Sequence, residues 1–455
     1  MSVTKLVGLA LACGLALLVA AESLWTTRPA LAAGISGVHE GVASCASSTC
    51  HGRLAPTGRS VRQNELISWQ DTSSAAGSHS QAWRVLTQPR ADAITAKMGL
   101  GPARNAPECL GCHADAVPVA MRGSRFQISD GVGCEACHGG SGGWLASHIA
   151  VGASHADNLA RGMIALDDAR SRAGLCLNCH FGSDKPGQFV SHRMMASGHP
   201  RLSFELDLFT TLQRHHTVDA DYAARKATPG GVKVWAVGQA MALERAVALY
   251  GSLRGQEGAF PEFYFFDCHS CHRRISDQPD VALTVEANPG RPIPVGMPPF
   301  DDANMIMLSA AARTAAPGQA ARFENDVRAF HAAMALDRAS AAAAGTRLAA
   351  SARLLADGFA SHNFSRADTF AILNDILGSA ASRYSDYAGG TQAVMAADTL
   401  LNAMVAAGQV DGNSVTALRG DIDRLYTAVR DPLAWRPAEF RDAIGRLAAA
   451  TRRLQ

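Results

Sequence analysis

Ten cysteines of this 455-residue chain fall into five pairs, and a histidine directly follows the second cysteine of every pair. Four pairs have two residues between the cysteines: Cys109 and Cys112 before His113, Cys134 and Cys137 before His138, Cys176 and Cys179 before His180, and Cys268 and Cys271 before His272. The remaining pair, Cys45 and Cys50 before His51, has four. Two thiols about one helical turn apart can add to the two vinyl groups of one porphyrin, and the next histidine can bind its iron from the proximal side. The pattern therefore predicts five covalently attached c-type haems, each with one iron.

Paired cysteines have other uses, and the histidine after each pair is what separates haem attachment from them. Zinc ribbons and redox disulfides also use two closely spaced cysteines. A structural zinc site needs four ligands and gives no reason for a histidine after every pair. A disulfide framework stays open as the alternative for an exported chain with ten paired cysteines. In the wide Cys45–Cys50 motif, the extra residues must bulge outward for both thiols to reach one porphyrin.

The segment that carries the pairs also supplies enough histidines for a second axial ligand on every iron. A haem iron with one histidine is open to substrate, whereas a second histidine closes it for electron transfer. Nine further histidines lie there: His39, His79, His148, His155, His192, His199, His215, His216 and His269. Sequence context selects five of them as distal ligands. The small neighbours of His79 let a porphyrin approach, His148 and His155 follow a glycine-rich loop, and His192 and His199 would share one face of a helix.

The first residues have the features of an export signal. Lys5 precedes an apolar run that extends from Leu6 to Ala21, and residues 1–32 are predicted to be a signal peptide. Cleavage after Ala32, cleavage after Ala21 and retention as an N-terminal membrane anchor all stay open. Export agrees with haem attachment, because c-type haem is assembled outside the bacterial cytoplasmic membrane. The expected location is the periplasm. The net charge of +2 is nearly balanced and does not indicate nucleic-acid binding.

Composition divides the rest of the chain into three zones, and the predicted fold class is mainly α. Residues 33–277 are glycine-rich and hold all five motifs, which predicts a loop-rich pentahaem cytochrome c domain with few short helices and one longer helix near Val232–Leu253. Haems would supply much of its apolar core. Residues 278–302 form a proline-rich connector, expected to be an extended strap. Residues 303–455 are rich in alanine and predict a bundle of four to six helices.

Within this C-terminal region, apolar stripes and turn residues mark individual helices. The stripes are Phe323, Val327, Phe330 and Met334, and then Leu418, Ile422, Leu425 and Val429. Ser365 to Asp368 is typical of a helix start, and Pro437 of a first helical turn. Gly389-Gly390 and Asp411-Gly412-Asn413 predict turns between helices. His331 and His362 are expected to be ordinary surface or core residues.

The segment from about His39 to Arg274 resembles the multihaem cytochrome c-554/c-prime family. The similar stretches are Ser78-His79-Ser80, the glycine-flanked motif from Gly131 to Gly139, and Ser197-Gly198-His199-Pro200. The resemblance implies soluble periplasmic electron carriers with haems in stacked pairs, and His79, His148 and His199 match distal ligands there. This chain departs from the family pattern by a fifth motif and by the helical C-terminal region, so haem order and partners do not carry over.

Three functions are compatible with these features. The first is a multihaem c-type cytochrome that passes electrons from a redox donor to a redox acceptor. The second is a multihaem oxidoreductase with one open haem that acts on a small nitrogen or sulfur compound. Arg122, Arg125, Arg273 and Arg274 could steer an anion there or pair with haem propionates. In the third, the C-terminal helices dock a membrane-associated or periplasmic partner. The short separation of the Cys109 and Cys134 motifs also predicts that their haems are neighbours.

Overall fold

The computed structural model describes residues 37–56, 62–226, 228–256, 262–268, 271–272, 298–378 and 386–455. The predicted signal peptide, most of the proline-rich connector, His269, Arg273 and Arg274 lie outside these residues. The described chain is mainly helical, as the sequence predicts. It contains no strand, only two isolated bridges, which join His39 to Arg122 and Phe266 to Phe300.

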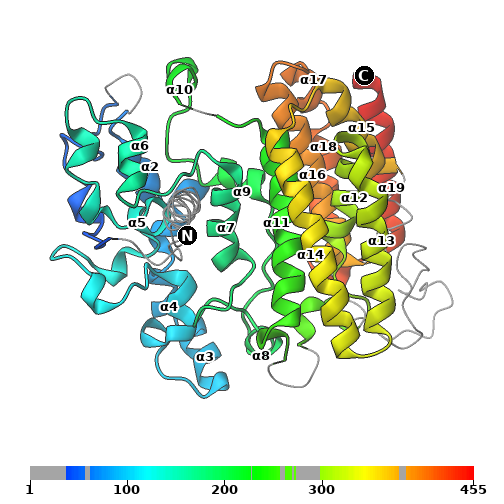
Figure 1. Cartoon of the computed structure of the whole chain (residues 1–455), viewed down its shortest axis with the longest axis horizontal. Coiled ribbons are helices and arrows are strands. Elements are labelled where there is room, and N and C mark those ends of the chain that lie inside the picture. Colours follow the sequence, from blue (N-terminus) through cyan, green and yellow to red (C-terminus); the bar gives the residue numbers. More distant parts are fainter. Residues whose placement is uncertain are drawn as a thin grey trace, which may run out of the picture.

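The first half of the chain consists of short helices joined by long loops (Figure 1). Three of these helices end on the histidine of a cysteine motif: α4 (Pro107–His113), α5 (Cys134–His138) and α7 (Ala169–His180). The other helices of this half are α2 (Glu65–Gln70), α3 (Pro89–Met98), α6 (His155–Ala160), α8 (His192–Ala196), α9 (Leu206–Leu212) and α10 (Ala220–Arg225). The prediction of a loop-rich region with short helices at the attachment motifs is confirmed.

The second half is a bundle of long helices, seen on the right of Figure 1. It comprises α12 (Ala303–Ala315), α13 (Pro317–Met334), α14 (Arg338–Ser361), α15 (Arg366–Gly378), α16 (Tyr387–Ala406), α17 (Gly412–Thr416), α18 (Arg419–Ala428) and α19 (Pro437–Thr451). The long helix predicted near Val232–Leu253 is α11 (Gly231–Gly251), and it packs against α14, α12 and α16 as well as α7. The bundle is larger than the predicted four to six helices, because several of its helices are short.

Most local signals in the bundle are confirmed, but neither predicted glycine turn lies where it is expected. Gly412 and Asn413 are the first residues of α17, which Asp411 caps. Phe323 and Phe330 are fully buried, and Pro437 begins α19. Ser365 and Asp368 exchange side-chain-to-backbone hydrogen bonds (2.9 and 3.1 Å) at the start of α15, which is a reciprocal helix cap. Gly389-Gly390, however, lies inside α16 and not in a turn. A Cβ on Gly390 would lie 2.5 Å from the Trp435 ring, so this glycine permits close packing.

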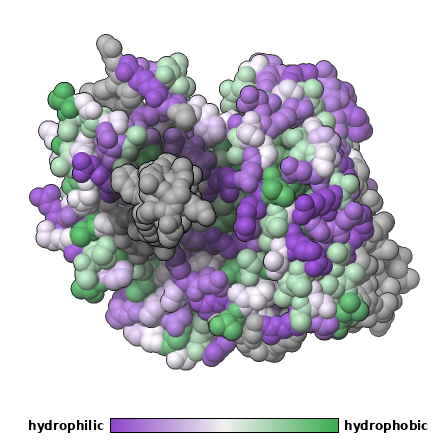
Figure 2. All heavy atoms as spheres, in the orientation of Figure 1, coloured by the Kyte–Doolittle hydropathy of each residue, from purple (hydrophilic) through white to green (hydrophobic). Residues whose placement is uncertain are grey.

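The buried apolar side chains form one large cluster that involves the bundle, α7 and α11. No residue before Ala169 belongs to this cluster among the described residues, although that segment contains three of the five cysteine motifs. The surface over the bundle is mixed, with hydrophobic residues scattered among polar ones (Figure 2). None of the described helices has the length and apolar character needed to cross a bilayer.

Candidate functional site

The local fold brings the two cysteines of each motif together and fixes the histidine that follows. In α4, α5 and α7 the helix itself sets the spacing of one turn. In the last motif, the His272 backbone amide donates to the Cys268 carbonyl (2.8 Å). In the wide motif, the His51 amide donates to the Cys45 carbonyl (3.1 Å), so the extra residues form a closed loop. No disulfide joins any of these ten cysteines in the described part of the chain, and Cys271 is exposed.

The central observation is that the histidine of every motif faces a second histidine. The distances between ring centroids are 6.5 Å for His51 and His148, 6.3 Å for His113 and His199, 6.1 Å for His180 and His79, and 6.2 Å for His272 and His192. His138 faces two histidines, His215 at 6.4 Å and His216 at 6.0 Å. The partners come from loops and helices far from the motifs in sequence, so the tertiary fold creates these pairs.

These separations fit one iron between each pair of rings. An imidazole nitrogen binds a transition metal at about 2 Å, and the ring centre lies about 1 Å behind that nitrogen. Two imidazoles on opposite sides of one iron therefore place their centroids about 6 Å apart. The observed range, 6.0 to 6.5 Å, agrees with this spacing.

Four of the five histidines predicted as distal ligands face a motif histidine: His79, His148, His192 and His199. His155 does not. It is exposed at the start of α6, and its Nε2 lies 3.7 Å from a carboxylate oxygen of Asp167. His192 and His199 also do not share a helix face, because α8 ends at Ala196, and they face different motifs.

Sequence context does not select the two adjacent histidines that face His138. His215 and His216 follow α9 in an ordinary polar stretch, without the small neighbours that favoured His79. Ligand atoms of these two residues and of His138 lie within 4.8 Å of one another. Only the unusual doublet of histidines could have identified them. His39 is different, since its Nδ1 lies 2.6 Å from the Asp115 carboxylate and it faces no motif.

Burial keeps several of these imidazoles neutral, which is the form that binds a metal. Burial, together with the nearby charges of His216, His215 and His51, lowers the pKa of His138 to about 3. Burial is also the main cause that lowers the pKa of His180 and of His215 to about 4 each. A neutral ring keeps a nitrogen lone pair available at neutral pH. These pockets therefore disfavour a charged histidine and suit a ligand role.

His51 differs from these because its outer nitrogen meets a carboxylate. Its Nδ1 lies 2.9 Å from Oε2 of the buried residue Glu65, and this hydrogen bond raises the pKa of His51. Burial alone raises the pKa of Glu65, but contacts from His216 and His51 outweigh it and hold that pKa well below its usual range. Glu65 is thus an anion between two histidines at neutral pH.

One further observation of the first half fits a large apolar cofactor. Residues 37–165 bury few apolar side chains of their own and add none to the main cluster, so they lack a protein core of the expected size. Trp144 packs edge-on to His148 (5.4 Å), beside one of the facing pairs.

Cysteines of different motifs are also close to each other. The Cys112 thiol lies 4.0 Å from the Cys179 carbonyl oxygen, and the Cys179 thiol lies 3.7 Å from the Gly111 carbonyl oxygen. The neighbouring Cys134 thiol lowers the pKa of Cys45. The first motif is therefore beside the third, and the second beside the fourth. The neighbours predicted from short sequence separation were the second and third motifs, so the fold adds long-range contacts that separation alone does not reveal.

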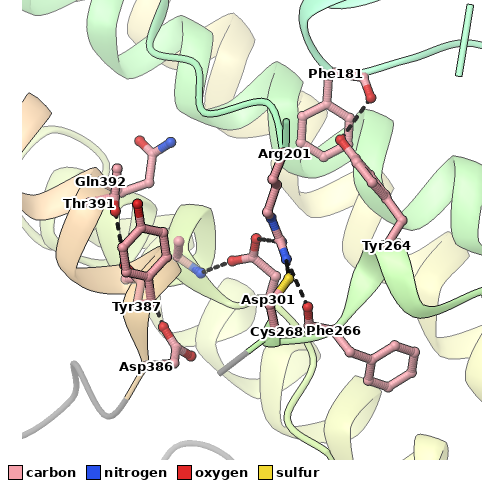
Figure 3. A network of polar contacts seen from close by, with 12 residues as sticks. Phe181, Arg201, Tyr264, Phe266, Cys268, Asp301, Asp386, Tyr387, Thr391 and Gln392 are labelled. Atoms are coloured by element: carbon pink, nitrogen blue, oxygen red, sulfur yellow. Dashed lines mark hydrogen bonds and ion pairs between the residues drawn. The ribbon is translucent and has the colours of Figure 1, made fainter. Parts of the chain in front are cut away.

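The last motif lies where the two halves of the molecule meet (Figure 3). The buried guanidinium of Arg201 donates to the Phe266 carbonyl (3.0 Å), to the Cys268 sulfur (2.6 Å) and to Asp301 (2.8 Å). Asp301 lies two residues before α12, and Tyr387 of α16 lines the same small hollow, which has a volume of about 50 Å³ and opens to solvent. The bundle is thus a wall of this site.

Comparison with known proteins gives one match. Residues 44–139, which include the first three cysteine motifs, match the family of cytochrome c554 and c-prime. No curated protein and no solved structure matches the chain. The match confirms the resemblance noted from the sequence. It supports a c-type cytochrome with covalently bound haem c and iron, which acts in electron transfer with redox protein partners.

Proposed function

We propose that this chain is an exported pentahaem c-type cytochrome that carries electrons between a donor and an acceptor protein. Its five cysteine motifs attach five haems, and each iron has two histidine ligands. The proximal ligands are His51, His113, His138, His180 and His272. The distal ligands are His148 for the first haem, His199 for the second, His215 or His216 for the third, His79 for the fourth and His192 for the fifth. When bound, these haems supply the one-electron chemistry.

The observation that carries the proposal is the set of ring pairs at 6.0 to 6.5 Å. An iron with two imidazole ligands has no position for a substrate, so it can exchange electrons but not bind a small molecule. The hypothesis of an oxidoreductase requires one iron with an open position, yet each of the five motif histidines faces a second histidine. Arg122, which could steer an anion, instead donates to the Val117 carbonyl (3.0 Å).

The contacts between motifs support electron transfer through the protein. Because Cys45 and Cys134 are neighbours, the haems that they tether would lie close together, and the same holds for Cys112 and Cys179. The role of the polypeptide is to hold these separations fixed. Several axial rings are held by their own hydrogen bonds, such as the bond from His113 Nδ1 to the Ala82 carbonyl (2.9 Å).

The C-terminal bundle, in this proposal, is a structural part of the cytochrome. Gln392 of α16 donates to the Phe204 carbonyl (2.9 Å), and the Thr399 hydroxyl donates to Glu205 (2.7 Å). Phe204 in turn stacks on His180 at 4.8 Å between centroids. The bundle therefore supports the residue behind a proximal histidine. The predicted signal peptide supports a periplasmic location for the whole chain.

Two measurements on the mature protein, made in a host that assembles c-type cytochromes, test the proposal. The intact mass should exceed that of the polypeptide by five haems. The reduced protein should not bind carbon monoxide, because every iron is closed. A mass with fewer than five haems contradicts the stoichiometry. Binding of one carbon monoxide per chain, with turnover of nitrite, hydroxylamine or tetrathionate, would support the oxidoreductase instead.

A further inference from the structure

Several of the facing histidines have an acceptor for their outer nitrogen, and these acceptors are of two kinds. When Nε2 binds iron, Nδ1 carries the proton and donates it outward. His113 Nδ1 lies 2.9 Å from the Ala82 carbonyl oxygen, His148 Nδ1 2.6 Å from that of Leu145, His199 Nδ1 2.8 Å from that of Pro200, and His215 Nδ1 3.3 Å from that of Gln213. All of these acceptors are neutral. His51 is different, because its Nδ1 lies 2.9 Å from a carboxylate oxygen of Glu65.

The fold fixes Glu65 in this position. Glu65 is the first residue of α2 and is only 6% exposed. Its Oε1 accepts a hydrogen bond from the Arg62 backbone amide (3.2 Å). The next residue, Leu66, donates its amide to the His51 carbonyl (3.0 Å), so the backbone of the motif and the start of α2 are joined directly. The carboxylate therefore cannot move away from the imidazole without disrupting the helix start.

The same carboxylate reaches a second facing histidine. Its Oε1 lies 3.8 Å from Nδ1 of His216, which is within ion-pair distance. The ring of His216 faces His138, the motif histidine of the third site. The first and third sites are also neighbours through Cys45 and Cys134. Glu65 thus connects the axial histidines of two neighbouring sites, and it favours His216 over His215 as the partner of His138.

A carboxylate acceptor changes the electronic character of the ligand. A hydrogen bond to an ionised acceptor is roughly twice as strong as one to a neutral carbonyl, so it draws the Nδ1 proton outward and makes Nε2 a stronger electron donor. A stronger donor stabilises ferric iron relative to ferrous iron. The negative charge of Glu65 acts in the same direction, and burial leaves it poorly screened.

We propose that Glu65 is a positioning residue that orients His51 and lowers the reduction potential of the haem tethered by Cys45 and Cys50. The inference rests on the proposed function, since it requires a haem at this motif with His51 as its proximal ligand. It adds a difference in reduction potential among the haems to that function, because a buried anion holds one haem at low potential.

The ring geometry gives a way to follow this haem alone. The His51 and His148 planes are nearly parallel, with 13° between them. The other pairs are tilted further, from 37° for His192 and His272 to 89° for His138 and His215. Nearly parallel axial imidazoles give a low-spin ferric haem a rhombic electron paramagnetic resonance signal, whereas crossed planes give a large maximum g value. The most rhombic signal should belong to the first haem.

The test is a potentiometric titration of that signal in the full holoprotein with Glu65→Gln. The variant keeps the size of the side chain and removes its charge. At a fixed potential, the ratio of reduced to oxidised first haem should rise about tenfold, which corresponds to about 59 mV for one electron. The matched control is Glu108→Gln. Like Glu65→Gln, it removes one carboxylate, but Glu108 is exposed and lies beside the attachment residue Cys109 and not against a facing histidine.

The outcomes separate this inference from the proposed function. A rhombic signal that titrates at the wild-type potential in Glu65→Gln, or a shift of equal size in Glu108→Gln, overturns the role of Glu65 and leaves the five closed haems untouched. If the wild-type protein itself shows no rhombic signal, the proposed function is contradicted. If Glu65→Gln does not accumulate, Glu65→Asp keeps the charge but shortens the reach, and its first haem must still shift upward by a smaller amount. No shift there overturns the inference as well.

Discussion

Replacing His148 with alanine should open one iron and leave the others closed. His148 is the histidine that faces His51, at 6.5 Å between centroids, and its ring is held by a 2.6 Å hydrogen bond to the Leu145 carbonyl and by the edge of Trp144. Alanine cannot reach the iron, so water takes the sixth position and the first haem becomes high-spin. With five haems in the chain, the change should convert about 20% of the iron, one in five.

The assay is electron paramagnetic resonance of the oxidised variant, with the high-spin signal integrated against total iron. Carbon monoxide should bind the reduced variant at one molecule per chain. His155→Ala is the matched control, because His155 lies seven residues further along the same part of the chain but is exposed and faces no motif histidine. The reasoning is refuted if His148→Ala stays entirely low-spin, or if His155→Ala gains the same high-spin fraction.

Three further predictions concern stability. Burial alone lowers the pKa of His39, but the hydrogen bond and charge of Asp115 outweigh it and raise that pKa. The pair therefore stabilises the folded state fully below pH 6.5, and this stabilisation is lost as the pH rises through the raised pKa of the folded state. Asp115→Asn should lower the free energy of unfolding, measured by chemical denaturation, more at about pH 5.5 than at about pH 9. Phe330→Ala should lower the free energy of unfolding by about 3–5 kcal/mol, because Phe330 is fully buried. Leu354 is 44% exposed, so Leu354→Ala should lower it by about 1 kcal/mol or less. Equal unfolding midpoints for the two variants would contradict the burial of Phe330. Deletion of residues 301–455 uncovers the buried faces of α11 and should abolish soluble, haem-loaded protein; a soluble fragment with a full haem spectrum would show that the bundle is separable.

The attachment sites are predictable from the sequence because their chemistry is local. Two thiols and a histidine within one helical turn suffice for attachment, so reading Cys134, Cys137 and His138 identifies a site without any knowledge of the fold. The same holds for helix starts such as Ser365 and Pro437, where a cap or a fixed backbone angle acts over a few residues.

Histidine pairing is not local, and there the sequence is a weaker guide. His155 and His148 have similar context, yet only His148 is turned toward a motif, because the rest of the loop decides which side faces inward. His216 lies far along the chain from His138 and has no distinctive neighbour except His215. Gly390 shows the same limit for the fold. It was expected in a turn, but contact with Trp435 on a distant segment explains its presence inside a helix.

In the proposed function, five haems share ten histidine ligands and no iron is open. The decisive measurement is electron paramagnetic resonance of the oxidised wild-type protein, integrated against total iron. All of the iron should be low-spin. The haem between the nearly parallel His51 and His148 rings should give one clearly rhombic signal, and the crossed pairs should give more axial signals. A high-spin signal that amounts to one iron per chain would contradict the proposed function.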